Sequence, residues 1–545
     1  MGIKRYVAMA DNTIVNAFKS NLTTRATGSN AGYADIVETF SVYGRQGSSS
    51  VELSRILMKF PVNSITTDRT NGAIPASGSV NFFLRLYNAP HSKTVPQDYT
   101  LVVEPISKDW QEGTGLDLET YNDETLQMTG SNWMSASKTT AWTKTGGDYI
   151  STANAAYPFR WYSQSFATGL EDMELDITGL VELWTAGTVD NYGVGVHLTG
   201  AYEGYYKRAN DGTYVGWNEN PTGSTISYYT KRFFARGTQY YFLRPTIEAR
   251  WDSTTKDDRG DIYYSSSLAP VNDNINTLYL YNYVRGTLRD IPASGDRTAG
   301  TDPIYVSFYS GSDDNSEPSG QAASSSATTR AAISLPTTLP RTWVPDDKNP
   351  YVVTGAWVST GIYSASFALT STAAPLTKIF DVWHDGSGKN APWASVEFAT
   401  SSFTPINLSA SQAIQKPTYH LNITNLKDLY RGDEISRFNL FIRQKYWKPT
   451  IYTVATDSIE SMTVQSASYR VFRLMDGYEA IPYGTGSNIH TGLSYDISGN
   501  YFDFDMNLLE PGYAYGFKFS FYDPSLRSWT EQREIFKFRV EEYEY

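Results

Sequence analysis

Histidines are the first residues to consider for catalysis or metal binding, because this 545-residue chain contains no cysteine. The five are His91, His197, His384, His420 and His490. None forms the H-x-x-x-H or H-E-x-x-H pair that places two imidazoles on one helical face for zinc. No G-x-S-x-G sequence marks a serine nucleophile either. Each histidine is therefore interpreted as a strand or turn residue; His197, for example, alternates with apolar neighbours.

Carboxylates are the second kind of residue that can do chemistry. Asp109 and Glu112 flank Trp110, and Asp117 and Glu119 follow shortly after. Glycosidases use two carboxyl groups whose pKa values are pushed apart by burial. We favour the alternative in which Trp110 packs into a sheet sandwich and the acids cap the turn. The sequence thus predicts that this chain is not an enzyme.

Two further acidic clusters contain ligands of the type that calcium prefers, namely loop carboxylates. Neither cluster has the twelve-residue EF-hand spacing, and solvated linker acids are the favoured interpretation. A structural calcium ion stays open as an alternative, and no other cofactor is predicted. The clusters are Asp257, Asp258 and Asp261, and Asp313, Asp314 and Glu317.

An aromatic hairpin is the most plausible contact surface. Asn210-Asp211-Gly212 is typical of a hairpin turn, and aromatic side chains stand on both sides of it. They can stack on sugar rings, anchor a neighbouring protein, or fold back over their own sheet. We rank the protein interface slightly ahead of the other two. The candidate contact residues are Tyr202, Tyr205, Tyr206, Tyr214 and Trp217.

Composition limits the classes of partner. The net charge is -12 and aromatic residues make up 14% of the chain. Positive charges are scattered, whereas nucleic-acid binding needs a concentrated basic face. No apolar run approaches the ~18 residues of a membrane helix, and the first residues lack the apolar core of a secretory signal. Neither nucleic acid nor membrane is expected as a partner.

Alternating apolar and polar residues, broken by Gly, Asn, Asp and Ser turns, predict the elements that position these side chains. Residues 171–198 show the pattern best, with alternating runs on either side of a helical turn at 179–185, as at the edge of a β-sandwich. Residues 252–261 have the polar, aperiodic composition of a linker. We predict an all-β, multidomain chain with sandwiches at 1–251, 262–410 and 413–545, the last two antiparallel and Ig-like.

Several pieces of residues 9–251 resemble, in order, the DNRLRE-type module. This family has a jelly-roll β-sandwich of the carbohydrate-binding-module kind, so the resemblance implies that fold for residues 1–251. Phe234-Ala235-Arg236-Gly237 stands where the family has Ser-Arg-Glu. The matching pieces are Asp11-Asn12-Thr13-Ile14, the strand Ser54 to Pro61, the strand Val80 to Tyr87, the turn Lys108 to Gly113 and the closing strand Leu243 to Trp251.

The whole chain resembles structural proteins of tailed-bacteriophage virions. The resemblance is carried by Ala10 to Lys19, by the Ser54 to Pro61 strand and by Tyr279 to Asp290. It implies a non-enzymatic component of the neck, tail or capsid surface, assembled in the host cytoplasm without export. Other virion proteins and further copies of the same chain are the implied partners. The alternative is a glycan-binding adhesin that recognises a host-surface polysaccharide.

Overall fold

The computed structural model describes residues 2–542 with interruptions. The segments that it does not describe are 20–24, 44–50, 92–94, 117–129, 205–219, 293–303, 311–330, 333–351, 370–377, 386–396, 407–417, 446–450, 452–460 and 485–487, with positions 1, 155, 159, 160, 221, 268, 525 and 543–545.

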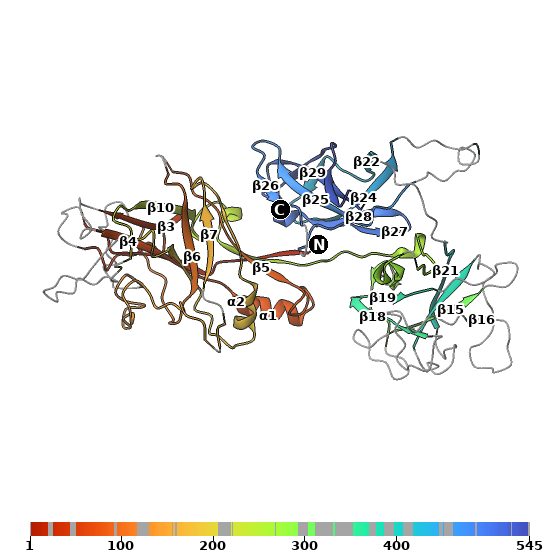
Figure 1. The fold of residues 1–545 in the computed structure, drawn as a ribbon, viewed down its shortest axis with the longest axis horizontal. Coiled ribbons are helices and arrows are strands. Elements are labelled where there is room, and N and C mark those ends of the chain that lie inside the picture. Colours follow the sequence, from red (N-terminus) through yellow and green to blue (C-terminus); the bar gives the residue numbers. More distant parts are fainter. Residues whose placement is uncertain are drawn as a thin grey trace. The chain divides into compact units, whose positions relative to one another are not determined.

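Strands dominate the structure and pair almost entirely in antiparallel fashion (Figure 1). Strands account for 47% and helices for 7%, which confirms the predicted all-β class with several β-sandwich sheets. Residues 2–252 and 485–490 form one compact unit, and residues 253–484 and 491–545 form the other. The boundaries 1–251, 262–410 and 413–545 remain a prediction.

The N-terminal sandwich consists of a four-stranded sheet, ordered β1-β11-β5-β8, and a seven-stranded sheet, ordered β10-β3-β4-β9-β6-β7 with β2 paired to β4. The strands are β1 (Ile3–Val7), β2 (Ala10–Val15), β3 (Ile36–Tyr43), β4 (Val51–Lys59), β5 (Asn81–Leu86), β6 (Tyr99–Pro105), β7 (Tyr162–Phe166), β8 (Met173–Asp176), β9 (Val194–Leu198), β10 (Tyr228–Phe234) and β11 (Thr246–Arg250).

Strand β4 shows why the larger sheet is buried on both faces. Successive side chains of a strand point to opposite faces. Ile56 and Met58 enter the core between the two sheets, whereas Leu53 and Leu57 enter a second cluster on the outer face. Three tryptophans, Trp110, Trp133 and Trp142, are part of this outer cluster.

Two helices cover one end of this sandwich (Figure 1). Helix α2 (Thr178–Thr185) confirms the predicted helical turn, and it follows β8, which is a sheet edge as expected. Strand β9 is not an edge, because it lies between β4 and β6. Helix α1 (Val62–Thr70) was not predicted from the sequence; Arg69 on α1 donates a 2.9 Å hydrogen bond to Glu182 on α2.

The middle of the chain forms a three-stranded sheet, β12-β19-β18, a two-stranded ribbon, β13-β14, and a five-stranded sheet, β16-β15-β20-β21 with β17 paired to β15. Phe308 and Phe367 face each other in the shared core, with ring centroids 4.3 Å apart. The strands are β12 (Asn276–Tyr281), β13 (Tyr283–Val284), β14 (Thr287–Leu288), β15 (Tyr305–Ser310), β16 (Ala331–Ala332), β17 (Val352–Thr354), β18 (Ala356–Ser359), β19 (Ile362–Phe367), β20 (Ile379–His384) and β21 (Glu397–Phe403).

The C-terminal part forms a four-stranded sheet, β22-β24-β28-β27, and a six-stranded sheet, β23-β31-β29-β25-β26 with β30 paired to β29. Aromatic rings fill its core; Phe517 and Phe538, for example, stack 4.6 Å apart. The strands are β22 (Tyr419–Ile423), β23 (Leu429–Arg431), β24 (Ile435–Gln444), β25 (Ala467–Arg473), β26 (Glu479–Ile481), β27 (Ser494–Asp496), β28 (Gly499–Asp505), β29 (Ala514–Asp523), β30 (Ser528–Glu531) and β31 (Phe536–Glu541).

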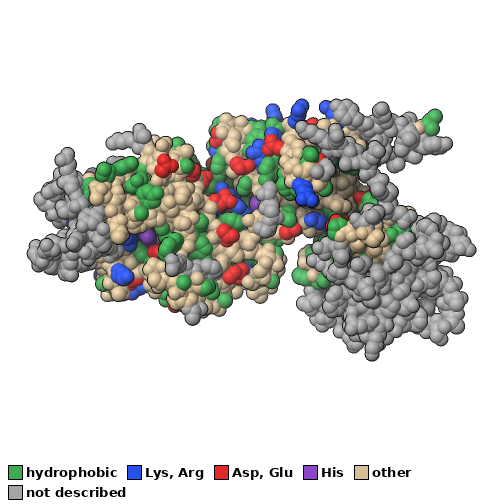
Figure 2. Space-filling model, in the orientation of Figure 1, with side chains coloured by type: hydrophobic (Ala, Val, Ile, Leu, Met, Phe, Trp, Pro, Cys, Tyr) green, Lys and Arg blue, Asp and Glu red, His purple; other side chains and the backbone are tan. Residues whose placement is uncertain are grey.

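Short 3-10 turns complete the described elements: η2 (Tyr241–Leu243), η3 (Asp258–Gly260), η4 (Val271–Asn274) and η5 (Met506–Leu508). Within the described ranges, no helix has the length and apolar character needed to cross a bilayer. On the face drawn in Figure 2, acidic and basic side chains are interspersed with hydrophobic ones.

Candidate functional site

Tyr202 is the one member of the predicted aromatic surface that the structure describes. Its ring is half-buried and lies 5.1 Å from the ring of Tyr229, nearly perpendicular to it at 82°. It packs against the core between the two sheets, so it folds back over its own sheet. The other four residues, Tyr205, Tyr206, Tyr214 and Trp217, lie outside the described residues, and their role as a contact surface stays a prediction.

Trp110 and the acids beside it are parts of the scaffold. Trp110 is 5% exposed and its indole Nε1 donates a 2.8 Å hydrogen bond to the carbonyl oxygen of Tyr192, so its predicted packing is correct. Asp109 pairs with Lys59 on β4 at 2.7 Å. The expectation that these acids cap the turn is wrong, because Asp109 and Glu112 bind groups from other segments. Asp117 and Glu119 lie outside the described residues.

Glu112, Arg236 and Asp11 meet in the N-terminal sandwich; Asp11 and Glu112 stand in pieces that resemble the DNRLRE module, and Arg236 stands in the segment that departs from it. The Arg236 guanidinium donates two hydrogen bonds to Glu112, at 2.9 Å to Oε2 and 3.2 Å to Oε1. The Asp11 amide donates a 2.9 Å bond to Glu112 Oε1, and Asp11 Oδ2 accepts from the Arg236 amide. This triangle ties β2 to two distant turns. The one sequence feature that pointed to this contact is the arginine in Phe234-Ala235-Arg236-Gly237.

Burial raises the pKa of Asp11 to about 7, and the nearby Glu112 charge contributes in the same direction. The Asp11 side chain has no exposed surface, and Oδ1 has no hydrogen-bond partner among the described residues. A paired arrangement of this kind can hold one proton near neutral pH. Because the Glu112 carboxylate is already paired with the Arg236 guanidinium, we infer that these three residues stabilise the fold.

The buried histidines have local partners. His384 Nε2 lies 3.0 Å from Ser307 Oγ, and burial lowers the pKa of His384 to about 4. His197, half-buried on β9, has Nε2 3.3 Å from Glu104 Oε2. Burial, with a contribution from the Arg250 charge, lowers the pKa of His490 to about 4. Local partners of this kind indicate that these histidines have structural roles.

Of the acids at 257–261, Asp261 is exposed as the sequence predicts, but Asp257 and Asp258 are not solvated linker residues. Asp257 is 7% exposed and its Oδ1 accepts a 3.1 Å bond from the Arg259 amide, which caps η3. Asp258 accepts a 2.8 Å bond from the Tyr495 hydroxyl and a 2.7 Å bond from the Thr277 amide. Burial raises the pKa of Asp257 to about 6.

The hydrogen bonds of Asp257 and Asp258 use carboxylate oxygens that would have to bind a calcium ion if one were held by this cluster. Within the described segments, no three metal-ligating side chains gather at one place. The second acidic cluster, Asp313, Asp314 and Glu317, lies outside the described residues.

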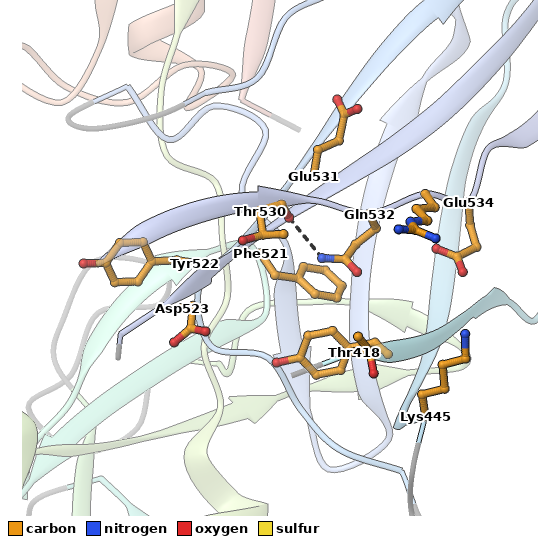
Figure 3. Close-up of a pocket in the computed structure, with 11 residues that line it drawn as sticks. Thr418, Lys445, Phe521, Tyr522, Asp523, Thr530, Glu531, Gln532 and Glu534 are labelled. Atoms are coloured by element: carbon orange, nitrogen blue, oxygen red, sulfur yellow. Dashed lines mark hydrogen bonds between the residues drawn. The ribbon is translucent and has the colours of Figure 1, made fainter. Parts of the chain in front are cut away.

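The described residues of the C-terminal sandwich form a cleft (Figure 3). It has a volume of about 470 Å³. Strand β22, with Tyr419, lies at the edge of one sheet, and β30, with Thr530, lies at an edge of the other. Tyr419 and the buried Phe521 meet edge to face across the cleft, with ring centroids 5.3 Å apart.

Charged and amide side chains surround this aromatic pair. Lys445 and Glu534 lie toward one end of the cleft, and Asp523 lies at the other (Figure 3). Arg533 also lines the cleft. Gln532 donates a 3.0 Å bond from Nε2 to the Thr530 carbonyl oxygen. With both charge signs and exposed edge backbone, the cleft can hold a polar peptide strand or a small polar ligand. No motif in residues 528–534 indicated it.

Comparison with known proteins does not place the chain in a family. No protein-family model matches the sequence, and no curated protein matches it. Fibronectin(III)-like modules of CbhA from Clostridium thermocellum share 10% identity, with 53% of this chain and 93% of that chain covered and a TM-score of 0.14. A DUF4785 family protein from Legionella pneumophila shares 8% identity over 92% and 90% of the two chains, with a TM-score of 0.13. TM-scores this low carry no argument about fold or function.

Proposed function

We propose that this protein is a non-enzymatic structural component of a phage virion, on the neck, tail or capsid surface. It acts through contacts between β-domains. The observation that carries the proposal is strand β30, in which all four residues, Ser528–Glu531, are exposed. Within the described part of the chain, β30 pairs only with β29, so its outer edge is open.

The register of β30 indicates which backbone groups a partner would meet. Gln532 donates its amide to the Phe519 carbonyl oxygen at 2.8 Å. Hydrogen-bonded and non-hydrogen-bonded pairs alternate along an antiparallel ladder. The amides of Trp529 and Glu531 therefore point away from β29. A strand of a neighbouring subunit can pair there, while the cleft beside β30 accepts its side chains.

Three other features support this proposal. The acids that looked catalytic at Asp109 and Glu112 are bound to cations within the scaffold. The resemblance of residues 9–251 to a DNRLRE module and of the whole chain to virion proteins agrees with such a role. The absence of cysteine in the sequence suits assembly in a reducing host cytoplasm. Other virion proteins and further copies of this chain are the proposed partners.

The test is co-assembly of the purified chain with virion particles, followed by sedimentation. We expect the chain to sediment with particles, and Trp529→Lys to reduce that association at least tenfold, because an edge lysine opposes strand pairing. Met475→Lys is the matched control, since Met475 is 74% exposed in a turn of the same sandwich. A wild-type chain that stays monomeric and never sediments with particles overturns the proposal.

Glycan binding is the second candidate. It is favoured by the half-buried ring of Tyr419 beside charged and amide groups, since sugar sites combine an aromatic surface with convergent polar groups. Titration with host polysaccharide tests it. Binding that is lost in Tyr419→Ala supports the cleft as the site. Flat titrations across host polysaccharides exclude this function.

A further inference from the structure

Lys231 on β10 is a fully buried lysine in the N-terminal sandwich, with no exposed surface. Its Nζ lies over two aromatic rings, 4.9 Å from the centroid of Phe166 and 5.1 Å from that of Phe233. Burial of this kind penalises an ammonium group. It lowers the pKa of Lys231 to about 8, so neutral amine is present at mildly alkaline pH.

The side chain of Asn88 is in direct contact with this amine. Nζ of Lys231 lies 2.7 Å from Oδ1 of Asn88. The backbone holds the two residues in place: Asn88 forms an antiparallel bridge with Phe233, and Ala89 donates its amide to the Arg232 carbonyl oxygen at 3.1 Å. The amide carbon of Asn88 is bonded to Oδ1, so this contact places the amine beside a carbonyl group.

A carboxylate stands beside this pair. Asp172 Oδ1 accepts a 2.7 Å hydrogen bond from the Asn88 backbone amide, and the charge of Asp172 acts on Lys231. The charge of the neighbouring acid, Glu171, also acts on Lys231, but its hydrogen bond to Nζ comes from its backbone carbonyl oxygen, at 2.8 Å, and its side chain accepts from the Thr168 amide. Of the two acids, Asp172 is hydrogen-bonded to Asn88 and has the larger electrostatic effect on Lys231.

A purely structural role would need only acceptors for the ammonium group. Two backbone carbonyl oxygens, of Gly169 and Glu171, already accept from Nζ at 2.9 and 2.8 Å. The third contact is different in kind, because a primary amide is an electrophile with a leaving group. The amine is fully buried, and the half-buried Asn88 and Asp172 lie at its side.

We propose that Lys231 and Asn88 form an intramolecular isopeptide bond, with Asp172 transferring the proton. The neutral Nζ attacks the side-chain carbon of Asn88, and an N–C bond forms. Asp172 accepts one of the two amine hydrogens and passes a proton to Nδ2. The C–Nδ2 bond then breaks and ammonia leaves. One amine and one primary amide give one secondary amide and one ammonia, with no change in oxidation state.

The position of this bond gives it a mechanical role. Asn88 follows β5 of the four-stranded sheet, whereas Lys231 lies on β10, the edge of the seven-stranded sheet. The link would join the two sheets covalently at one rim of the sandwich. A chain with no cysteine has no disulfide for this purpose, and an amide link does not depend on the redox state of the compartment.

The test is the intact mass of the purified full-length chain after incubation at mildly alkaline pH. We expect a mass lower than that of the sequence by one ammonia, and fragment spectra in which a peptide with Lys231 is joined to a peptide with Asn88. Succinimide formation at Asn71-Gly72 also releases ammonia, but it joins no peptides. A folded wild-type chain that keeps the mass of its sequence overturns the proposal.

Variants separate the roles of the residues. Lys231→Arg and Asn88→Ala are each expected to keep the mass of their sequence. Asp172→Asn retains an acceptor for the Asn88 amide and is expected to slow the mass change by about 10²-fold, whereas Glu171→Gln is expected to react at the wild-type rate. Reaction of Asp172→Asn at the wild-type rate overturns its assignment as the proton-transfer group.

Discussion

Arg259 and Asp381 form a doubly hydrogen-bonded ion pair, in which Nη1 lies 2.7 Å from Oδ1 and Nη2 lies 2.8 Å from Oδ2. The Asp381 side chain has no exposed surface. The Trp383 indole donates a further 2.8 Å bond to Oδ2. Residues 259–261 have the sequence Arg-Gly-Asp of an adhesion tripeptide, but the guanidinium of Arg259 is already paired with Asp381.

Removal of the arginine leaves a buried carboxylate without its cation. We therefore expect Arg259→Met to lower the free energy of unfolding by roughly 3–5 kcal/mol, measured by calorimetry and by faster hydrogen exchange in β20. Arg431→Met, at the largely exposed pair with Asp433, should leave both measurements nearly unchanged. Similar effects of the two variants would show that the buried pair is not a major source of stability.

Gly193 is a position where a side chain has no space. Its φ is 84° and an added Cβ would lie 1.8 Å from the Met58 carbonyl oxygen in β4. Gly187 has a similar φ of 70° but open surroundings. Gly187→Ala should cost only the left-handed backbone penalty, about 1–2 kcal/mol, while Gly193→Ala should prevent stable folding of the N-terminal sandwich. Equal melting temperatures for the two variants would refute the close approach.

Asp11 should make the N-terminal sandwich less stable as pH rises. The folded chain binds this proton up to about pH 7, whereas the unfolded carboxyl has its ordinary value of 3.8. Between these values the folded state holds more protons, so the free energy of unfolding falls with increasing pH. Asp11→Asn should remove this slope in denaturant titrations across pH 4–7. Asp109→Asn, at a side chain that is 65% exposed, should keep it.

His384 should act in the opposite direction in the middle of the chain. Its folded pKa is about 4 against an ordinary value of 6.5, so the unfolded chain binds the extra proton between these values. Acidification from pH 6.5 to 4 should therefore cost up to about 3 kcal/mol. Thermal melts of His384→Gln should show a smaller loss over this window, and melts of exposed His420→Gln should follow the wild type.

Local patterns explain what the sequence could predict. Strand β8 and helix α2 were predicted correctly because their patterns lie within a few neighbouring residues. In β8 the pattern is the alternation of Met173 and Leu175, and in α2 it is the apolar face of Leu180, Val181 and Trp184. Helix α1 has few apolar residues and three threonines, which have low helix propensity. It is held instead by tertiary contacts such as Arg69 to Glu182.

Contacts across the fold could not be predicted in the same way. Asp11 and Glu112 each stood in a piece that resembles the module, and Arg236 stood in the segment that departs from it, yet their meeting depends on how β2 and two turns are placed by the sheets. The contact of Lys231 with Asn88 depends on the register of the bridge between Asn88 and Phe233. A linear pattern contains neither relationship, because each is decided by packing between segments that are far apart in the chain.

The pairing of β1 with β11 places Ile3 opposite Arg250, and the Trp251 amide donates a 2.8 Å bond to the Gly2 carbonyl oxygen. The chain therefore enters and leaves the N-terminal sandwich at neighbouring points. Such a module can be grafted into a surface loop of an unrelated carrier protein through short spacers, without stretching the recipient loop.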